Sequence, residues 1–178
     1  EKVSWQIIYN MLDNDGNTIM VETQKWAMRI VDGKYILDLE WIGDAKVDIT
    51  INKFDYGGMF LRMPWRNGMK AEVINAPGHK DQQAEGRRAK WLDIGIQVEG
   101  RDDLAHIAIF DHQENRGYPT AWRVDGQFGV GPSRAINNDW SIKNGDSEII
   151  HHELIVYTGE LEISRMNDMW DTFVRGDA

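Results

Sequence analysis

Alternation of apolar and polar residues constrains the fold of this chain more than any other feature. Residues 45–54 read AKVDITINKF, a pattern with a period of two that is typical of a strand with one buried face. The same alternation recurs in four other stretches, at residues 57–63, 90–99, 104–111 and 147–158. Each such strand must bury its apolar face against another layer, so the pattern predicts an all-β protein.

Turn signals divide the first part of the chain into further strands. Residues 3–43 are rich in Val, Ile, Tyr, Trp and Thr, and turn residues interrupt them at 13–16 and 32–33. Polar residues with Gly and Pro predict a loop at 75–88, and another follows Asp111. The strands are therefore joined by short connections, as in antiparallel sheets.

Helix is expected only near the C-terminus. Residues 159–174 have the charge and apolar spacing of a helix, which Gly176 would end. Nothing repeats at a fixed period of the kind that marks solenoids or propellers. We therefore predict one domain over residues 1–178, an antiparallel β-sandwich of the jelly-roll type with nine or ten strands and little helix.

Charge and composition exclude several classes of function. The net charge of −9 argues against nucleic-acid and anionic-membrane partners, because no basic face is available to displace counterions from phosphates. No apolar run approaches the roughly 20 residues that a membrane span needs, so we expect a soluble chain. The absence of cysteine excludes thiol nucleophiles, thiolate metal sites and disulfides. No GxSxG, P-loop or dinucleotide-binding motif is present.

The stretch from 109 to 135 concentrates hydrogen-bonding side chains in a predicted loop. The candidate residues are Asp111, His112, Asn115, Arg116 and Arg123. Such a set can bind sugar hydroxyls or a carboxylate, and arginine can form paired bonds to planar acceptors. Alternatively, Asp111 and Asn115 only cap turns. We expect an ordered loop whose polar groups converge on one pocket, since they are costly to bury unpaired. His112 would be its titrating group.

Eight tryptophans are many for a chain of 178 residues. Their rings either fill a large core or stack on the apolar C–H faces of sugars. Trp91 and Trp122 are the stacking candidates, and Asp93 faces the same side as Trp91 because it lies two residues along a strand. Asp93 would accept a hydroxyl or act as acid or base. The alternative is cross-strand packing beside an exposed carboxylate. Arg62 and Arg87 complete the predicted substrate-binding set.

No metal or other cofactor is predicted. The DNDGN stretch at 13–17 resembles the start of a calcium loop, but Gln24 stands where that loop needs a glutamate, so a hairpin turn is expected. His151 and His152 lie in mid-strand and face opposite sides, so they cannot share one metal. His106 and His112 could bind one metal together only if the chain bends between them.

Four motifs carry a resemblance to a known family, and they read YGGMFLRMPW, AKWLDIG, IFDHQENRGYPTAWRV and VYTGE. In order and spacing they resemble the C-terminal part of a soluble bacterial family labelled PmoA-like, or "methane oxygenase", from about Trp5 to Gly159. The motif around His112, Asn115 and Trp122 is the most specific. The resemblance implies a longer architecture with an upstream Asp-His-x-His-His stretch, which these 178 residues do not contain.

The resemblance also implies a carbohydrate ligand, because the family is encoded beside sugar-handling proteins in polysaccharide-degrading bacteria. The leading hypothesis is a protein that acts on or binds a glycoside or oligosaccharide, periplasmic or secreted. As an enzyme it would be a hydrolase or lyase, in which Asp111, Asp93 and His112 exchange protons. The alternatives are a non-catalytic carbohydrate-binding or scaffold module and, as the family label implies, a metal-dependent oxidative enzyme.

Overall fold

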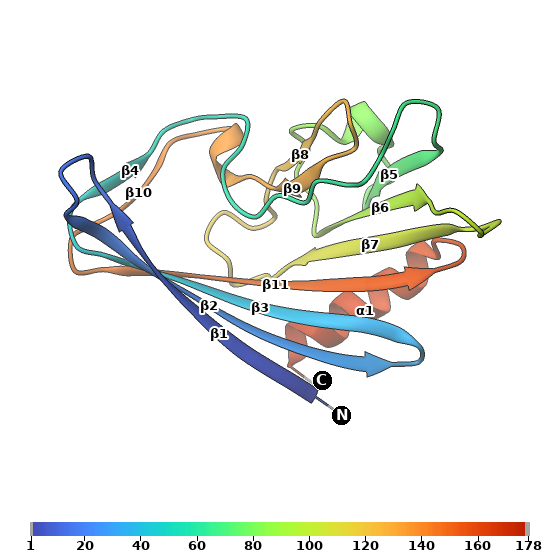
Figure 1. Ribbon diagram of the computed structural model, residues 1–178, viewed down its shortest axis with the longest axis horizontal. Helices are drawn as coiled ribbons and strands as arrows, with labels where there is room; N and C mark the ends of the chain where they lie inside the picture. Colours follow the sequence, from blue (N-terminus) through green and yellow to red (C-terminus); the bar gives the residue numbers. More distant parts are fainter. Residues whose placement is uncertain (1, 177–178) are drawn as a thin grey trace.

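A seven-stranded antiparallel sheet forms the body of the protein (Figure 1). The computed structural model describes residues 2–176. The order of strands in the sheet is β1-β2-β3-β11-β7-β6-β5, and two ribbons, β4 with β10 and β8 with β9, stand apart from it. The strands are β1 (Lys2–Leu12), β2 (Thr18–Val31), β3 (Lys34–Ala45), β4 (Ile49–Ile51), β5 (Ala71–Asn75), β6 (Trp91–Gln97), β7 (Leu104–Asp111), β8 (Trp122–Val124), β9 (Val130–Pro132), β10 (Trp140–Ile142) and β11 (Ser147–Thr158).

Tight turns set the register of the first three strands. β2 and β3 are joined by Asp32 and Gly33 alone, and both have positive φ, at 49° and 73°. Two positive-φ residues between paired strands are typical of a type I′ hairpin, for which an Asp-Gly sequence is favoured. The turn pairs Val31 with Lys34, and the pairing then continues without a break to Met20 and Ala45.

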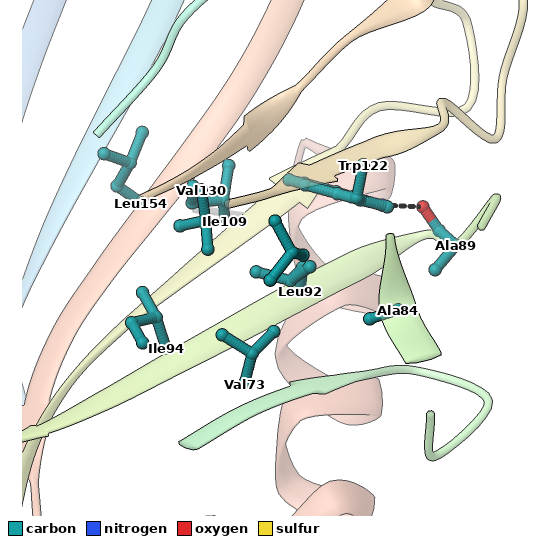
Figure 2. Close-up of a cluster of buried hydrophobic side chains, with 10 residues drawn as sticks. Val73, Ala84, Ala89, Leu92, Ile94, Ile109, Trp122, Val130 and Leu154 are labelled. Carbon is teal, nitrogen blue, oxygen red and sulfur yellow. Dashed lines mark hydrogen bonds between the residues drawn. The ribbon is translucent and has the colours of Figure 1, made fainter. Parts of the chain in front are cut away.

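The middle strands of the sheet are buried on both faces. On one face Leu92, Ile94 and Ile109 pack against Trp122 and Val130 of the β8–β9 ribbon (Figure 2). We call this side of the sheet the ribbon face. The alternate residues point to the opposite side, where α1 (Ile163–Arg175) lies, and we call that side the helix face. Strands β6 and β7 are therefore mostly apolar on both faces.

The C-terminal helix closes the helix face. Met166 and Trp170 are buried against the sheet, and the indole Nε1 of Trp170 donates to the carbonyl oxygen of Asp111 at 2.9 Å. Gly176 ends the helix with φ +70°, a conformation that glycine adopts without strain. Two short 3-10 helices, η1 (Asp81–Ala84) and η2 (Arg134–Ile136), complete the elements. In the described part of the chain, no helix has the length and apolar content needed to cross a membrane.

The predicted all-β antiparallel architecture with one C-terminal helix is confirmed, and two predicted strands are corrected. β7 and β11 have the predicted bounds. Residues 45–54 do not form one strand: Ala45 ends β3, a bend follows, and only β4 remains, paired with β10. Residues 57–63 form a single bridge, between Leu61 and Val130. Met59, Leu61 and Met63 pack against the core, so their alternation reflects burial rather than membership of a sheet.

Candidate functional site

A cavity of about 440 Å³ lies on the ribbon face, toward the β1 side of the sheet. Its floor consists of side chains from β2, β3 and β11, and its walls come from residues 57–59, the loop after β7, and the chain from Pro132 to Ile142. Because alternate residues of a strand share a face, one side of each floor strand supplies the lining. Of the β8–β9 ribbon, only Pro132 at the end of β9 is part of the lining in residues 2–176.

A chain of hydrogen bonds fixes the part of the floor that β2 provides. Glu22, Gln24 and Trp26 alternate along the strand and all line the cavity. Gln24 Nε2 donates to Glu22 Oε1 at 2.6 Å, and Trp26 Nε1 donates to Gln24 Oε1 at 3.1 Å. Trp5 on β1 stacks on Trp26, with ring centroids 6.1 Å apart. These contacts hold polar and aromatic groups at defined positions.

Two further indole rings line the cavity. The ring of Trp41 on β3 lies over Gly43, where an added Cβ atom would stand 2.3 Å from the ring carbon Cη2. Only glycine leaves room for the ring in this position. On the other side of the cavity, the guanidinium of Arg134 lies 4.4 Å from the centroid of Trp140 and bonds Glu148 Oε1 at 2.7 Å. Trp140 Nε1 is buried and has no hydrogen-bond partner among residues 2–176.

Asp111 ends β7 with its carboxylate on the ribbon face, at the cavity wall. Asn115 Nδ2 donates to its Oδ1 at 2.8 Å, and the backbone N–H of Thr120 donates to its Oδ2 at 2.7 Å. Burial raises the pKa of Asp111 to about 6, although these two hydrogen bonds act in the opposite direction. The group therefore gains or loses its proton in a mildly acidic range.

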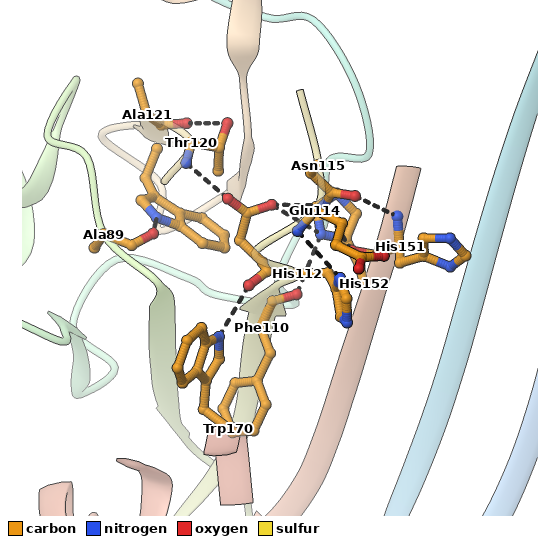
Figure 3. A network of polar contacts seen from close by, with 12 residues as sticks. Ala89, Phe110, His112, Glu114, Asn115, Thr120, Ala121, His151, His152 and Trp170 are labelled. Atoms are coloured by element: carbon orange, nitrogen blue, oxygen red, sulfur yellow. Dashed lines mark hydrogen bonds and ion pairs between the residues drawn. The ribbon is translucent and has the colours of Figure 1, made fainter. Parts of the chain in front are cut away.

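His152, labelled in Figure 3, lies on β11 directly opposite Asp111 of the neighbouring strand β7. Its Nδ1 lies 3.2 Å from the carbonyl oxygen of Phe110 and 3.8 Å from Asp111 Oδ1. Because a carbonyl only accepts, Nδ1 carries the proton in the neutral ring and Nε2 keeps the lone pair. Burial lowers the pKa of His152 to about 4. Between about pH 4 and pH 6 a protonated carboxyl and a neutral imidazole thus stand side by side.

The loop after β7 is held in place by side chains at both ends. Asn115 Nδ2 also donates to the carbonyl oxygen of His151 at 2.7 Å, and Asn115 Oδ1 accepts the His151 N–H at 2.8 Å. Arg88 Nη1 donates to the carbonyl oxygens of Gly117 and Pro119, at 2.8 and 2.9 Å. The loop is ordered because its polar groups bond to one another and to β11.

Three of the predicted site residues line this cavity, namely Asp111, Asn115 and Arg116. Arg116 is mostly exposed, and its Nη1 lies 3.5 Å from Glu148 Oε2. Glu148 is buried between the guanidinium groups of Arg116 and Arg134. One carboxylate therefore faces two guanidinium groups at this end of the cavity.

The position predicted for His112 is corrected. It follows Asp111 directly and so points to the opposite side of the sheet. Its ring centroid lies 5.7 Å from that of His151 and 5.0 Å from that of Phe173 in α1. Burial lowers the pKa of His112, but the ring does not line the cavity.

Trp91 and Asp93 are also placed on the helix face, which corrects their predicted site roles. Trp91 is fully buried beneath α1, and its Nε1 donates to Asn167 Oδ1 at 3.0 Å. Asp93 is 2% exposed, lies 2.7 Å from His106 Nδ1, and accepts the hydroxyl of Tyr157 at 2.7 Å. A fully buried indole offers no face to a ligand, so this pair belongs to the core.

Trp122 and Arg123 support the ribbon face from outside the cavity. Trp122 is fully buried in the core, and its Nε1 donates to the carbonyl oxygen of Ala89 at 2.9 Å (Figure 2). The guanidinium of Arg123 bonds Glu85 Oε1 at 2.5 Å and lies 4.6 Å from the ring centroid of Tyr56. These contacts raise the pKa of Arg123, which remains a cation with a structural partner.

The remaining two predicted residues are exposed and lie outside the cavity. The guanidinium of Arg62 is 5.6 Å from the ring centroid of Phe60. Arg87 is exposed at the end of the loop that precedes β6. Neither residue is part of the lining, so the structure does not gather them with Asp111.

Sequence reasoning missed several lining residues, of which His152, Glu22, Trp41 and Arg134 matter most. The alternation of β11 correctly placed the two adjacent histidines on opposite faces. It did not show that His152 pairs with Asp111, because that requires knowing which strands are neighbours. Within residues 2–176, no three His, Cys, Asp or Glu side chains come together as a metal site would require.

The comparisons with known proteins place the chain in a family without an assigned activity. Residues 2–171 match the model of a family of unknown function, DUF6807. This description carries no oxygenase assignment. No match was found among curated proteins.

One solved structure, described as a kojibiose phosphorylase from the human microbiome, aligns with this chain at a TM-score of 0.47 and 6% sequence identity. The alignment covers 98% of this chain and 21% of that chain, so the present chain spans about a fifth of its length. A similarity of this size says nothing about activity. The family match extends over nearly the whole chain, and the protein therefore belongs to DUF6807, a family of unknown function.

Proposed function

We propose that the protein binds a carbohydrate in the ribbon-face cavity and that Asp111 and His152 move protons on it. The observation that carries this proposal is the Asp111–His152 pair at the wall of a cavity lined by indole rings. Burial raises the pKa of Asp111 to about 6 and lowers the pKa of His152 to about 4, so a proton donor and a proton acceptor coexist between these two pH values. Such shifts are typical of catalytic acids and bases.

The lining suits a sugar better than a purely apolar ligand. Trp26, Trp41 and Trp140 offer flat aromatic surfaces for C–H faces. The amide of Gln24 keeps one N–H and one oxygen lone pair for hydroxyl groups. A volume of about 440 Å³ lies in the range of sites for small ligands. The unpartnered Nε1 of Trp140 also favours a ligand that accepts hydrogen bonds, since buried donors are normally paired.

The arrangement favours proton transfer over a displacement that needs two carboxylates. The other carboxylate of the cavity, Glu22, lies on β2, three strands away from Asp111 on β7. Trp26 is in register with Asp111 through β11 and β3, and Glu22 lies four residues farther along. Strand spacing and rise then put the two Cα atoms about 20 Å apart. Glycosidase carboxyl pairs are at most about 9.5 Å apart.

We therefore propose a rearrangement or an elimination on a glycoside that carries a carbonyl group beside the reacting C–H. His152 Nε2 takes the proton from that carbon, and Asp111 gives its proton to the carbonyl oxygen in a rearrangement, or to the leaving glycosidic oxygen as the C–O bond breaks in an elimination. A second candidate is a carbohydrate-binding module without turnover. It is favoured by the tight hold on Asp111, whose two oxygens each accept a hydrogen bond from the protein. Chromatographic analysis of sugars incubated with the protein separates the two, because only the first candidate changes the sugar.

The test of the proposal is a screen with α- and β-linked disaccharides and tetrasaccharides of glucose, xylose and mannose. Binding is measured by titration calorimetry. For a sugar that binds, replacing Trp41 with alanine should weaken binding by about 1–3 kcal/mol, the effect of losing an aromatic stacking surface. Trp65→Ala is the matched control, since Trp65 packs on Phe128 outside the cavity. Equal losses in both variants, or no binding by any sugar of the panel, would contradict the proposal.

His112 and His152 differ in the face they occupy, and this predicts opposite results for the same substitution. His112→Gln should leave the affinity for the bound sugar unchanged, because its ring lies on the helix face beside Phe173. His152→Gln should weaken binding and abolish any turnover, because it removes the ring nitrogen at the cavity wall. Calorimetry and product analysis on the two variants measure the difference. If His152→Gln kept the affinity and turnover of the wild-type protein, His152 would not be part of the site.

A further inference from the structure

The strand β1 forms one edge of the sheet and is exposed along its length (Figure 1). Within residues 2–176 its one pairing is with β2. Six of its eleven residues are large exposed hydrophobics, with Val3 at 58% and Leu12 at 57% exposure at its two ends. A long apolar edge with unpaired backbone groups is a template for pairing with another strand.

The opposite edge of the sheet shows how this chain protects a strand that is meant to stay unpaired. β5 has only five residues, and the following turn covers its outer side. Ile74 forms a bridge with Lys80, the Val73 N–H donates to Asp81 Oδ1 at 2.9 Å, and the Asn75 N–H donates to the His79 carbonyl oxygen at 3.1 Å. No such cover lies over β1 among residues 2–176.

The charged residues of the first three strands lie on the inner strands and not on the edge strand, where they would prevent pairing. From residue 3 to residue 12, β1 contains no charged residue and no proline. The inner strands β2 and β3 carry charged residues instead, among them Glu22, Lys25, Arg29 and Asp38. Soluble proteins usually place charges or prolines on edge strands to prevent pairing. The pattern here is that of a strand with a neighbour on both sides.

We propose that two copies of this chain pair through β1, antiparallel across a two-fold axis, so that the two sheets become one. A second copy fits this edge because residues 3–12 carry no charge and Lys2 would face Leu12 of the partner subunit, so antiparallel pairing sets no like charges opposite each other. The net charge of −9 lies outside residues 3–12 and makes other surfaces of two copies repel each other, which leaves β1 as the uncharged surface of contact. A two-fold axis uses the same strand on both copies, as in most homodimers.

The register that pairs the whole strand is centred on Ile7. Ile7 then faces Ile7 of the partner subunit, and Trp5 faces Tyr9 of the partner subunit, on the ribbon face of both sheets. Cross-strand aromatic pairs are a favourable feature of antiparallel sheets. Met11, which lines the cavity, would face Val3 of the partner subunit, so the second copy would extend the cavity wall.

The test is the mass of the full chain in solution, measured by sedimentation equilibrium. We expect twice the 20.5 kDa of one chain. Ile7→Lys and Ile7→Glu should each give monomers, because each sets two like charges opposite one another at the axis. Mixing the two variants should restore the dimer. Ile149→Lys is the control that keeps the dimer, since Ile149 is 48% exposed but lies on the inner strand β11.

A second measurement does not depend on charge. The chain has no cysteine, so Ile7→Cys introduces a single thiol at the axis, and oxidation should link two chains. Ile149→Cys should stay unlinked under the same conditions. A monomeric wild-type protein would overturn the proposal. So would dimers of both charged variants, or a mixture of the two that remains monomeric.

Discussion

Replacing Trp122 with alanine should lower the free energy of unfolding by about 3–5 kcal/mol, the usual cost of removing a large buried ring. Trp122 is fully buried and packs against Leu92 and Ile109 (Figure 2). The substitution also leaves the carbonyl oxygen of Ala89 without its donor. The measurement is urea-induced unfolding followed by circular dichroism.

Trp5→Ala is the matched control for this prediction. Trp5 is 39% exposed and stacks on Trp26 at the sheet edge, so its loss should cost much less, about 0.5–1.5 kcal/mol. If Trp122→Ala instead retained the stability of the wild-type protein and lost sugar binding, Trp122 would be a ligand-stacking residue after all, and its placement in the core would be wrong.

The sequence predicted the strands better than the site, and the reason is visible at the end of β7. Residues 104–111 were located correctly as a strand, because they form a short apolar stretch with few polar residues, bounded by turn residues. The alternation of faces along the strand separates Asp111 from His112. The two are adjacent in the chain, but one faces the cavity and the other faces α1. The sequence motif joined residues that the sheet keeps apart.

Strand order was the information that the sequence did not contain. The cavity joins Glu22 and Trp41 to Asp111, although they lie far apart in the chain, because β2 and β3 follow β11 in the sheet. A period of two shows which residues of a strand share a face, but not which strand is its neighbour. For the same reason the sequence could not show whether Trp91 and Trp122 are core residues or ligand-stacking residues, because burial depends on which element covers each face of the sheet.

Asp111→Asn should cause the largest loss of function, at least about 100-fold in turnover, since general acids contribute about 10²–10⁴-fold. The substitution keeps the shape of the side chain, and one oxygen can still accept the Thr120 N–H. Asn115 Nδ2 keeps its second acceptor, the His151 carbonyl oxygen. The fold should therefore persist. If the protein only binds sugar, the same variant should weaken binding measured by calorimetry, and unchanged binding would exclude Asp111 from the site.

The pH dependence distinguishes the acid from a merely structural carboxylate. Turnover should rise through about pH 4 as His152 loses its proton and fall above about pH 6 as Asp111 loses its own.

The free energy of unfolding should also depend on pH through these two groups. The contribution of Asp111 is complete below its ordinary pKa of 3.8 and is lost as the pH rises through about 6, because the folded state holds the proton more tightly.

His152 acts in the opposite sense, since its contribution to stability is complete above its ordinary pKa of 6.5 and is lost as the pH falls through about 4. In Asp111→Asn the upper limb of the activity profile should vanish while the lower limb remains, and His152→Gln should remove the lower limb. Rates and unfolding midpoints measured from pH 3 to pH 8 test both statements. Within residues 2–176, Asp111 is the carboxyl beside His152 at the cavity wall. A fall in turnover above about pH 6 that survives in Asp111→Asn would therefore show that Asp111 is not the catalytic acid.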